Sequence, residues 1–151
     1  MGAFWGRLNR VSVSNGSQIQ CHIGAAVGHE DIGMEFDRYT IALLLLHNDA
    51  PSFTEDEEAA LQDAHMSHLA DLHAAGHLLA AGPVLGPPDR ELRGFSILNV
   101  DPEQARALKE QDPAVRAGKF RVEVYPWVLP AGLMTFSPGR LPRSMVEAQG
   151  G

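Results

Sequence analysis

The chain has 151 residues, a formal net charge of -7 and a pI of about 5.4, and hydrophobic residues make up 44% of it. This length and composition predict one domain with a packed core. The acidic balance argues against nucleic acid or an anionic membrane surface as a partner. Cys21 is the only cysteine, which excludes an intrachain disulfide and a cysteine-based zinc site. The longest apolar run, Ile41–Leu46, is too short to cross a bilayer, and we expect a cytoplasmic protein.

Residues 1–33 differ in composition from the rest of the chain. Glycines recur through them, and serine, asparagine and glutamine fill much of the space between, with no sustained helical or strand period. We expect a flexible N-terminal extension here, with one weak strand at Val11–Val13. Met34 directly precedes the first strong element and is an alternative start of the protein.

The first strong elements are a strand and a helix. Tyr39–His47 is an apolar run rich in β-forming residues and predicts a buried strand. Thr54, with Glu57 three residues later, has the pattern of a capping box. We expect the helix that follows to cover Glu55–Ala75 and to end at Gly76, a residue type typical of the position just beyond a helix.

Two strands and a second helix come next. Apolar stretches at His77–Ala81 and Leu92–Val100 predict strands, joined by a loop at Gly86–Arg90. Asp101 is typical of a residue that caps a helix, with proline directly after it at the first helical position. The expected second helix covers Pro102–Gln111.

The last elements follow Asp112-Pro113, which predicts a short turn closed by Gly118. Phe120–Trp127 alternates apolar and polar side chains and predicts the final strand. Proline and glycine are frequent further on, so we expect residues 131–151 to form a loose C-terminal tail. The folded domain is then expected over residues 34–130.

The order of expected elements is β-α-β-β-α-β. This is the split βαβ, ferredoxin-like arrangement of the α+β class, in which two helices cover one face of a four-stranded sheet. The first strand is apolar on both faces, which predicts that its second face is also covered. Two helices cannot cover both faces, so we expect a homodimer in which a second copy supplies the cover.

Histidines occupy the buried stripe of the first expected helix. At about 100° per residue, Leu61, His65, His68 and Leu72 fall within one narrow sector. A positioned imidazole can give or take a proton near neutral pH, so His65 is a candidate catalytic residue and His68 a candidate substrate-binding residue. The alternative is a core or interface histidine that hydrogen-bonds to a backbone carbonyl.

The same region raises the question of a metal site. His65 and His68 are spaced i, i+3, and His73 and His77 are spaced i, i+4. The two pairs point in different directions, and no nearby carboxylate completes a set of ligands. We therefore expect no metal.

Asp112, Gly82 and Pro83 complete the set of candidate site residues. Asp112 precedes a proline and can cap a short helical turn, and a second carboxylate oxygen is then free to face a histidine. Gly82 and Pro83 either line a pocket beside His65 or simply end a strand. No phosphate-binding loop or dinucleotide motif is present, and we expect no cofactor.

Several short motifs follow one another in order along this part of the chain. They are His65 with Leu69, Leu72 and Gly76; Leu78–Pro83; Gly94; Asp112–Gly118; and Val122–Val124 before Pro126-Trp127. In order and spacing, the segment Tyr39–Trp127 resembles the YCII-related (YciI-like) family. The resemblance implies a dimeric α+β barrel with a ferredoxin-like fold. It also implies an active site formed by a His–Asp pair, here His65 and Asp112.

The resemblance further implies a reaction class, a dehydrochlorinase-type elimination on a chlorinated, hydroxylated aromatic. A cofactor-independent lyase or isomerase acting on a small molecule is thus the first functional hypothesis. The second is a non-catalytic ligand-binding or accessory module with the same dimeric fold. The third is a heme-independent monooxygenase-like activity on a hydroxylated aromatic.

Overall fold

The computed structural model describes residues 10–12 and 33–150. Most of the expected N-terminal extension, residues 1–33, lies outside these ranges. Within it, the structure has a short strand β1 at Arg10–Ser12, close to the weak strand expected at Val11–Val13.

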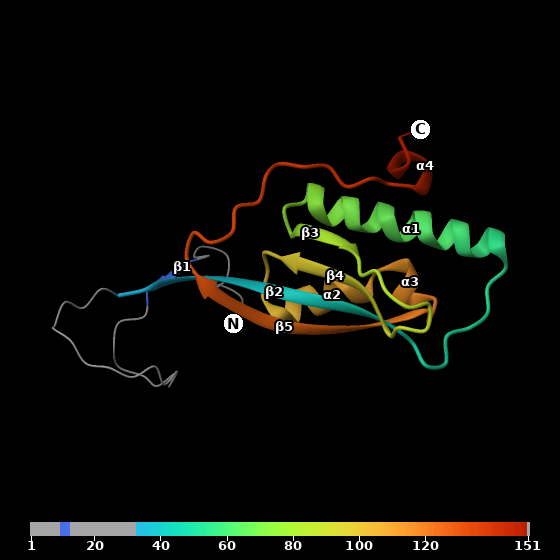
Figure 1. The fold of residues 1–151 in the computed structure, drawn as a ribbon, viewed down its shortest axis with the longest axis horizontal. Helices are drawn as coiled ribbons and strands as arrows, with labels where there is room; N and C mark the ends of the chain where they lie inside the picture. The colour runs from blue at the N-terminus through green and yellow to red at the C-terminus, as the bar shows by residue number, and fades with distance from the viewer. Residues whose placement is uncertain (1–9, 13–32, 151) are drawn as a thin grey trace.

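One antiparallel sheet organises the fold (Figure 1). Its central strand β2 (Glu35–Leu46) pairs with β4 (Leu92–Leu98) along one edge and with β5 (Phe120–Pro130) along the other. Strand β3 (Leu78–Pro83) pairs with β4, and β1 pairs with the first residues of β2. The four long strands therefore lie in the order β3-β4-β2-β5.

Strands β2 and β5 are both longer than the apolar pattern predicted. The additional residues pair with each other, with Phe36 opposite Pro130 and Asp37 opposite Leu129. Each extension thus supplies the hydrogen-bonding partner of the other. The apolar pattern of one strand therefore cannot predict where these strands end.

Helix α1 covers Glu55–Ala74, as its capping signals predicted. The Thr54 hydroxyl accepts a hydrogen bond from the Glu57 amide, and the Glu57 carboxylate accepts one from the Thr54 amide, which completes the capping box. The helix ends before Gly76, whose φ of 79° is in the left-handed region that glycine adopts at little cost.

Two shorter helices follow β4. Helix α2 covers Pro102–Glu110 and is capped by the Asp101 side chain, which accepts from the Gln104 amide. Helix α3 covers Pro113–Arg116 directly after it and is capped by Asp112. The chain then enters β5.

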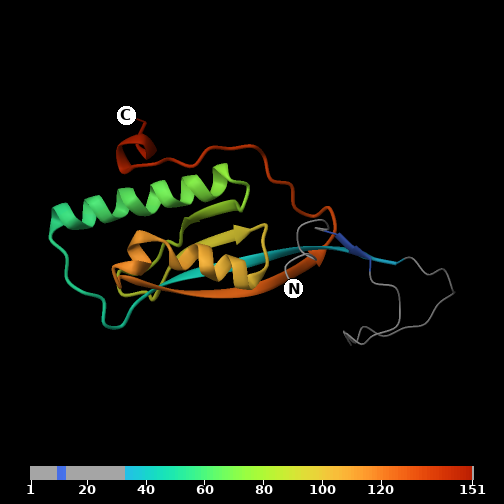
Figure 2. The same cartoon turned by 180° about the vertical axis from the view of Figure 1, so that it is seen from behind.

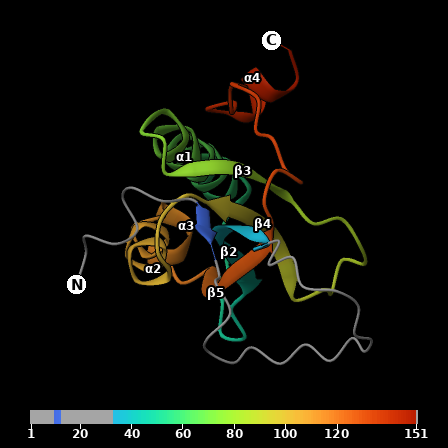
Figure 3. The same ribbon diagram turned by 90° about the vertical axis from the view of Figure 1, so that its left-hand side faces the viewer.

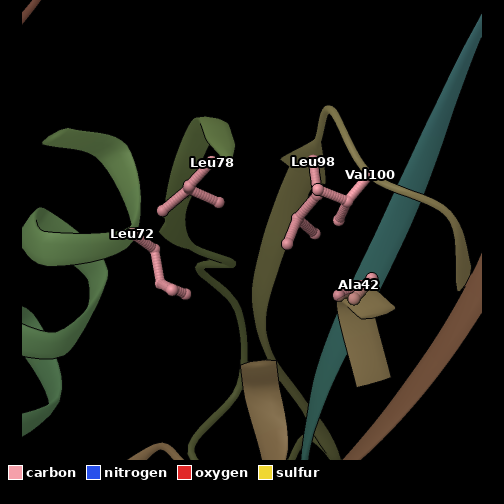
Figure 4. Packing of buried hydrophobic residues seen from close by; sticks show 6 residues of the cluster. Ala42, Leu72, Leu78, Leu98 and Val100 are labelled. Carbon is pink, nitrogen blue, oxygen red and sulfur yellow. The ribbon is translucent and has the colours of Figure 1, made fainter. Parts of the chain in front are cut away.

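Helices α1, α2 and α3 lie on the same side of the sheet (Figure 3), which gives the predicted ferredoxin-like α+β fold. The main core lies between this face and the helices. Figure 4 shows its buried side chains, which come from β2, α1, β3, β4 and the segment after β4. They are Ala42, Leu72, Leu78, Leu98 and Val100, with Ala105 of α2.

The other face of the sheet carries a smaller apolar cluster of Tyr39, Ile97 and Leu129. Met134 and Phe136, from the segment after β5, pack against part of it. Phe95, whose neighbour across the ladder is Leu43, stays exposed. The same chain therefore covers part of the second face, and the homodimer stays a prediction.

The C-terminal segment runs back along α1 and ends in a short helix α4 at Met145–Ala148 (Figure 2). The Arg143 guanidinium lies 2.7 Å from the Asp71 carboxylate, and the Met145 amide donates to Asp63 at 2.8 Å. We expected residues 131–151 to be loose. Instead, hydrogen bonds and an ion pair dock part of this segment on α1.

Candidate functional site

His65 and Asp112 come from different elements and meet in the interior. His65 lies in the middle of α1, and Asp112 lies at the junction of α2 and α3. The His65 Nδ1 and Asp112 Oδ2 atoms are 2.7 Å apart. The pair expected from the family resemblance is therefore within hydrogen-bonding distance, 47 residues apart in sequence.

The two interpretations of Asp112 are compatible in the structure. Its Oδ1 accepts a hydrogen bond from the Ala114 amide at 2.9 Å and caps α3. Its Oδ2 faces His65. The residue is 0% exposed, so both oxygens are used within the protein. The bond from the Ala114 amide holds the carboxylate in place independently of its contact with His65.

The surroundings of Asp112 keep it ionised. Burial raises the pKa of Asp112, but the hydrogen bond and charge of His65, the Ala114 amide and the charge of Lys109 outweigh burial and hold the pKa below its ordinary value. A carboxylate accepts only, so His65 must donate from Nδ1. In the neutral imidazole, Nε2 then carries the lone pair, which is the form a general base requires.

A cavity of about 400 Å³ lies beside this pair. Helix α1 contributes His65 and its neighbours, and strands β3 and β4 form the opposite wall. Most of the lining is apolar. The lining residues are Leu44, Gln62, His65, Met66, Leu69, Ala81, Gly82, Pro83, Arg93, Gly94, Phe95, Ser96, Lys109, Phe120, Leu141, Pro142, Met145 and Ala148.

Gly82 and Pro83 lie on the cavity wall, as one of the two sequence interpretations expected. They also end β3, as the other expected. A Cβ atom built on Gly82 would meet no atom within 4 Å, so this position faces open space.

His68 is not among the residues that line the cavity. Its Nε2 donates to the Leu108 carbonyl oxygen at 3.1 Å. Burial lowers the pKa of His68, although the charge of Asp112 and the bond to Leu108 oppose this shift. This contact fits the alternative of a histidine that hydrogen-bonds to a backbone carbonyl, and substrate binding by His68 stays a prediction.

Sequence reasoning missed two parts of the cavity wall. Lys109 is one: it is 2% exposed and lies one turn before Asp112. Its position in a helix rich in polar residues gave no sign of burial. The other part is the docked C-terminal segment, which contributes Leu141, Pro142, Met145 and Ala148.

No metal site or membrane span stands out in the part of the chain that the structure describes. Among residues 10–12 and 33–150, no three histidine, cysteine, aspartate or glutamate side chains are grouped so that they would hold an ion. The two ring nitrogens of His73 instead lie 2.7 and 2.8 Å from the Leu78 and Gly139 carbonyl oxygens. No helix in these ranges has the length and apolar character that crossing a bilayer needs.

Comparison with known proteins places the chain in a family. A solved structure of 5-chloro-2-hydroxyhydroquinone dehydrochlorinase from Burkholderia phenoliruptrix AC1100, in complex with 2,5-dihydroxybenzoquinone, is similar at 22% identity and a TM-score of 0.44. The match covers 59% of this chain and 92% of that one. No curated protein matches the chain. The model of the YCII-related domain matches residues 41–128, more than half of the sequence, and the chain therefore belongs to the YCII-related family.

Proposed function

We propose that this protein is a small-molecule enzyme in which His65 transfers protons and Asp112 orients it. The observation that carries the proposal is the 2.7 Å contact between His65 Nδ1 and a fully buried carboxylate, on the wall of an apolar cavity. The carboxylate fixes the imidazole tautomer and stabilises the imidazolium that forms when His65 takes a proton.

The proposed ligand is a small hydroxylated aromatic molecule. Phe120 and Met66 offer apolar surface to a ring, and Ser96 and Gln62 offer hydrogen bonds to hydroxyl groups. The cavity volume of about 400 Å³ is in the range of ordinary small-molecule sites.

The reaction to test first is loss of hydrogen chloride from a chlorinated, hydroxylated ring. In this scheme, Nε2 of His65 takes the proton of one hydroxyl group and returns a proton to the ring carbon that carries chlorine. That carbon becomes tetrahedral. A second hydroxyl then loses its proton and its O–H electron pair forms a carbonyl bond. The adjacent ring C=C pair moves to the bond with the chlorine-bearing carbon, and chloride leaves with the C–Cl pair. The products are a quinone and HCl, with no external oxidant.

The decisive experiment is chloride release from chlorinated hydroxyhydroquinones by wild type, His65→Gln and His77→Gln. Replacing a positioned acid–base group lowers turnover by about 10²- to 10⁴-fold. His77 is outside the cavity lining, so His77→Gln is the matched control and should retain activity. Equal turnover in His65→Gln and wild type, with both folded, would refute the proton-transfer role.

A non-catalytic binding module is the alternative outcome. It predicts that the same aromatics bind to wild type without any turnover, and that His65→Gln weakens binding alone. Oxygen uptake with quinols would instead indicate the monooxygenase-like activity.

The homodimer is part of the same proposal. Phe95 and Tyr125 are exposed large hydrophobic residues, and their cross-strand neighbours Leu43 and Ile41 place them on the helix-free face of the sheet. A second copy on this face would remove these rings from water. Sedimentation of wild type against Tyr125→Glu tests it: wild type should sediment as a dimer and the variant as a monomer.

A further inference from the structure

Lys109 is a buried lysine on the cavity wall. It lies in the last turn of α2, and its carbonyl oxygen accepts a hydrogen bond from the Asp112 amide. The residue is 2% exposed, and its side chain is among the largest that are fully enclosed. Lysine is rarely buried to this degree unless a partner compensates for the lost hydration of its charge.

The ammonium group of Lys109 has no hydrogen-bond or ion-pair partner among the described residues. The charge of Asp112 raises the pKa of Lys109, but both oxygens of Asp112 bond to other groups. Lys119, the other lysine of the sequence, is different, because it forms an ion pair with Glu58. The charge of Lys109 thus loses its hydration on burial, and no hydrogen bond or ion pair within the described residues replaces it.

The ionisable side chains on the cavity wall are all basic. His65, Arg93 and Lys109 are basic, and none of the residues lining the cavity is aspartate or glutamate. Arg93 Nε is itself buried without a partner within the described residues. A protein with a net charge of -7 therefore has an interior site that lacks acidic side chains and contains unpaired donors.

We propose that Lys109 binds an ionised oxygen, carboxylate or phenolate, of the small molecule that occupies this cavity beside His65. The proposal rests on the proposed function for the existence of a substrate, and it specifies the class of that substrate as an organic anion with an apolar body. An anionic oxygen would supply the acceptor that the protein does not provide, in surroundings where such a bond is strong.

The same contact assists the proposed chemistry. When His65 removes a hydroxyl proton, negative charge forms on the substrate oxygen. A fixed ammonium beside that oxygen stabilises the charge as it develops. Lys109 is then a substrate-binding residue that acts beside the proton-transferring pair.

Matched ligands on the full chain test the proposal by calorimetry in buffer free of carboxylates and phosphate. Benzoate and benzamide have nearly the same shape and differ in charge, and 4-nitrophenolate replaces the carboxylate by a phenolate. We expect wild type to bind at least one of the two anions at least tenfold more tightly than benzamide. Lys109→Met should lose that preference and leave benzamide binding within twofold, and Lys119→Met should bind like wild type.

The pH dependence gives a second readout. Burial lowers the pKa of Lys109, and the charge of Asp112 only partly opposes this. Anion binding should therefore decline as the pH rises through a value below that of an ordinary lysine, and this decline should be absent in Lys109→Met. Lys109→Gln repeats the test if the methionine variant does not fold.

The outcome separates this proposal from the proposed function. Binding of an anion by His65→Gln at wild-type strength, with loss in Lys109→Met, supports the lysine site whatever the turnover shows. Equal affinity of wild type and Lys109→Met for both anions, or failure of wild type to prefer either anion over benzamide, overturns it. Chloride release that depends on His65 would remain valid in either case.

Discussion

The chain uses the dipeptide Asp-Pro twice to begin a helix, and the two aspartates differ in burial and in their side-chain contacts. Asp101 caps α2, with its carboxylate accepting from the Gln104 amide at 2.8 Å near the surface. Asp112 caps α3 in the same way through one oxygen, but it is completely buried and its second oxygen meets His65. The local role is the same at both positions. Only at Asp112 does the packing of α1 bring a histidine side chain to the carboxylate.

The largest expected contrast is in stability after removal of each side chain. Asp112→Ala leaves the His65 ring and the Ala114 amide without their buried partner, and breaking a buried pair typically costs about 3–5 kcal/mol. Asp101→Ala removes only an N-cap, which costs about 0.5–2 kcal/mol. Urea denaturation of both variants measures the difference. Equal losses would mean that the contact with His65 adds nothing beyond capping.

A smaller structural change should separate the two sites in function. Asparagine can cap a helix, but at position 112 it cannot supply the negative charge that holds the His65 tautomer. We expect Asp112→Asn to lower turnover by about 10²-fold or more, and Asp101→Asn to leave it unchanged. The control is the Nδ1–H proton of His65 in NMR spectra, which should be present in wild type and Asp101→Asn and altered in Asp112→Asn.

The pH dependence of stability is the next test. The folded-state pKa of Asp112 lies below its ordinary value of 3.8, so its contribution is complete above that value and is lost as the pH falls through the folded-state pKa. Wild type should therefore lose stability on acidification below about pH 4. Asp112→Asn should lose less over the same range. Parallel curves from urea titrations between pH 6 and 2 would argue against the ionised carboxylate.

The smallest effect is expected at the surface cap. Serine is nearly as good an N-cap as aspartate, so Asp101→Ser should change the free energy of unfolding by less than about 0.5 kcal/mol. Asp112→Ser should resemble Asp112→Ala, because a hydroxyl can cap α3 but cannot replace the charge beside His65. The pair of serine variants thus isolates the electrostatic contribution from capping.

The fold was largely predictable because its signals are local. Apolar runs gave the strands, and Thr54, Glu57 and Gly76 marked the ends of α1, so the order of elements and the ferredoxin-like class followed. The ends of β2 and β5 were missed, because pairing between distant residues extends them.

The candidate site was only partly predictable. His65 and Asp112 were found through the motif resemblance, and the contact between them depends on packing that no single segment contains. Helical spacing put His68 beside His65, but spacing cannot tell a side chain that faces a cavity from one that bonds to the Leu108 carbonyl. Lys109 was missed because long charged side chains are usually exposed, and its burial is decided by the elements around it.

The docked C-terminal segment makes one wall of the cavity sensitive to dissolved salt. Arg143 with Asp71 is an exposed ion pair that ties this segment to α1, and Arg140 pairs with Glu147 within it. Exposed pairs of this kind are weakened when ions screen them over about 8 Å at physiological strength. We therefore expect ionic strength to affect how firmly Met145 and its neighbours are held on α1 beside the cavity. If the proposed ligand binds there, its rates of entry and release should rise together as salt is added.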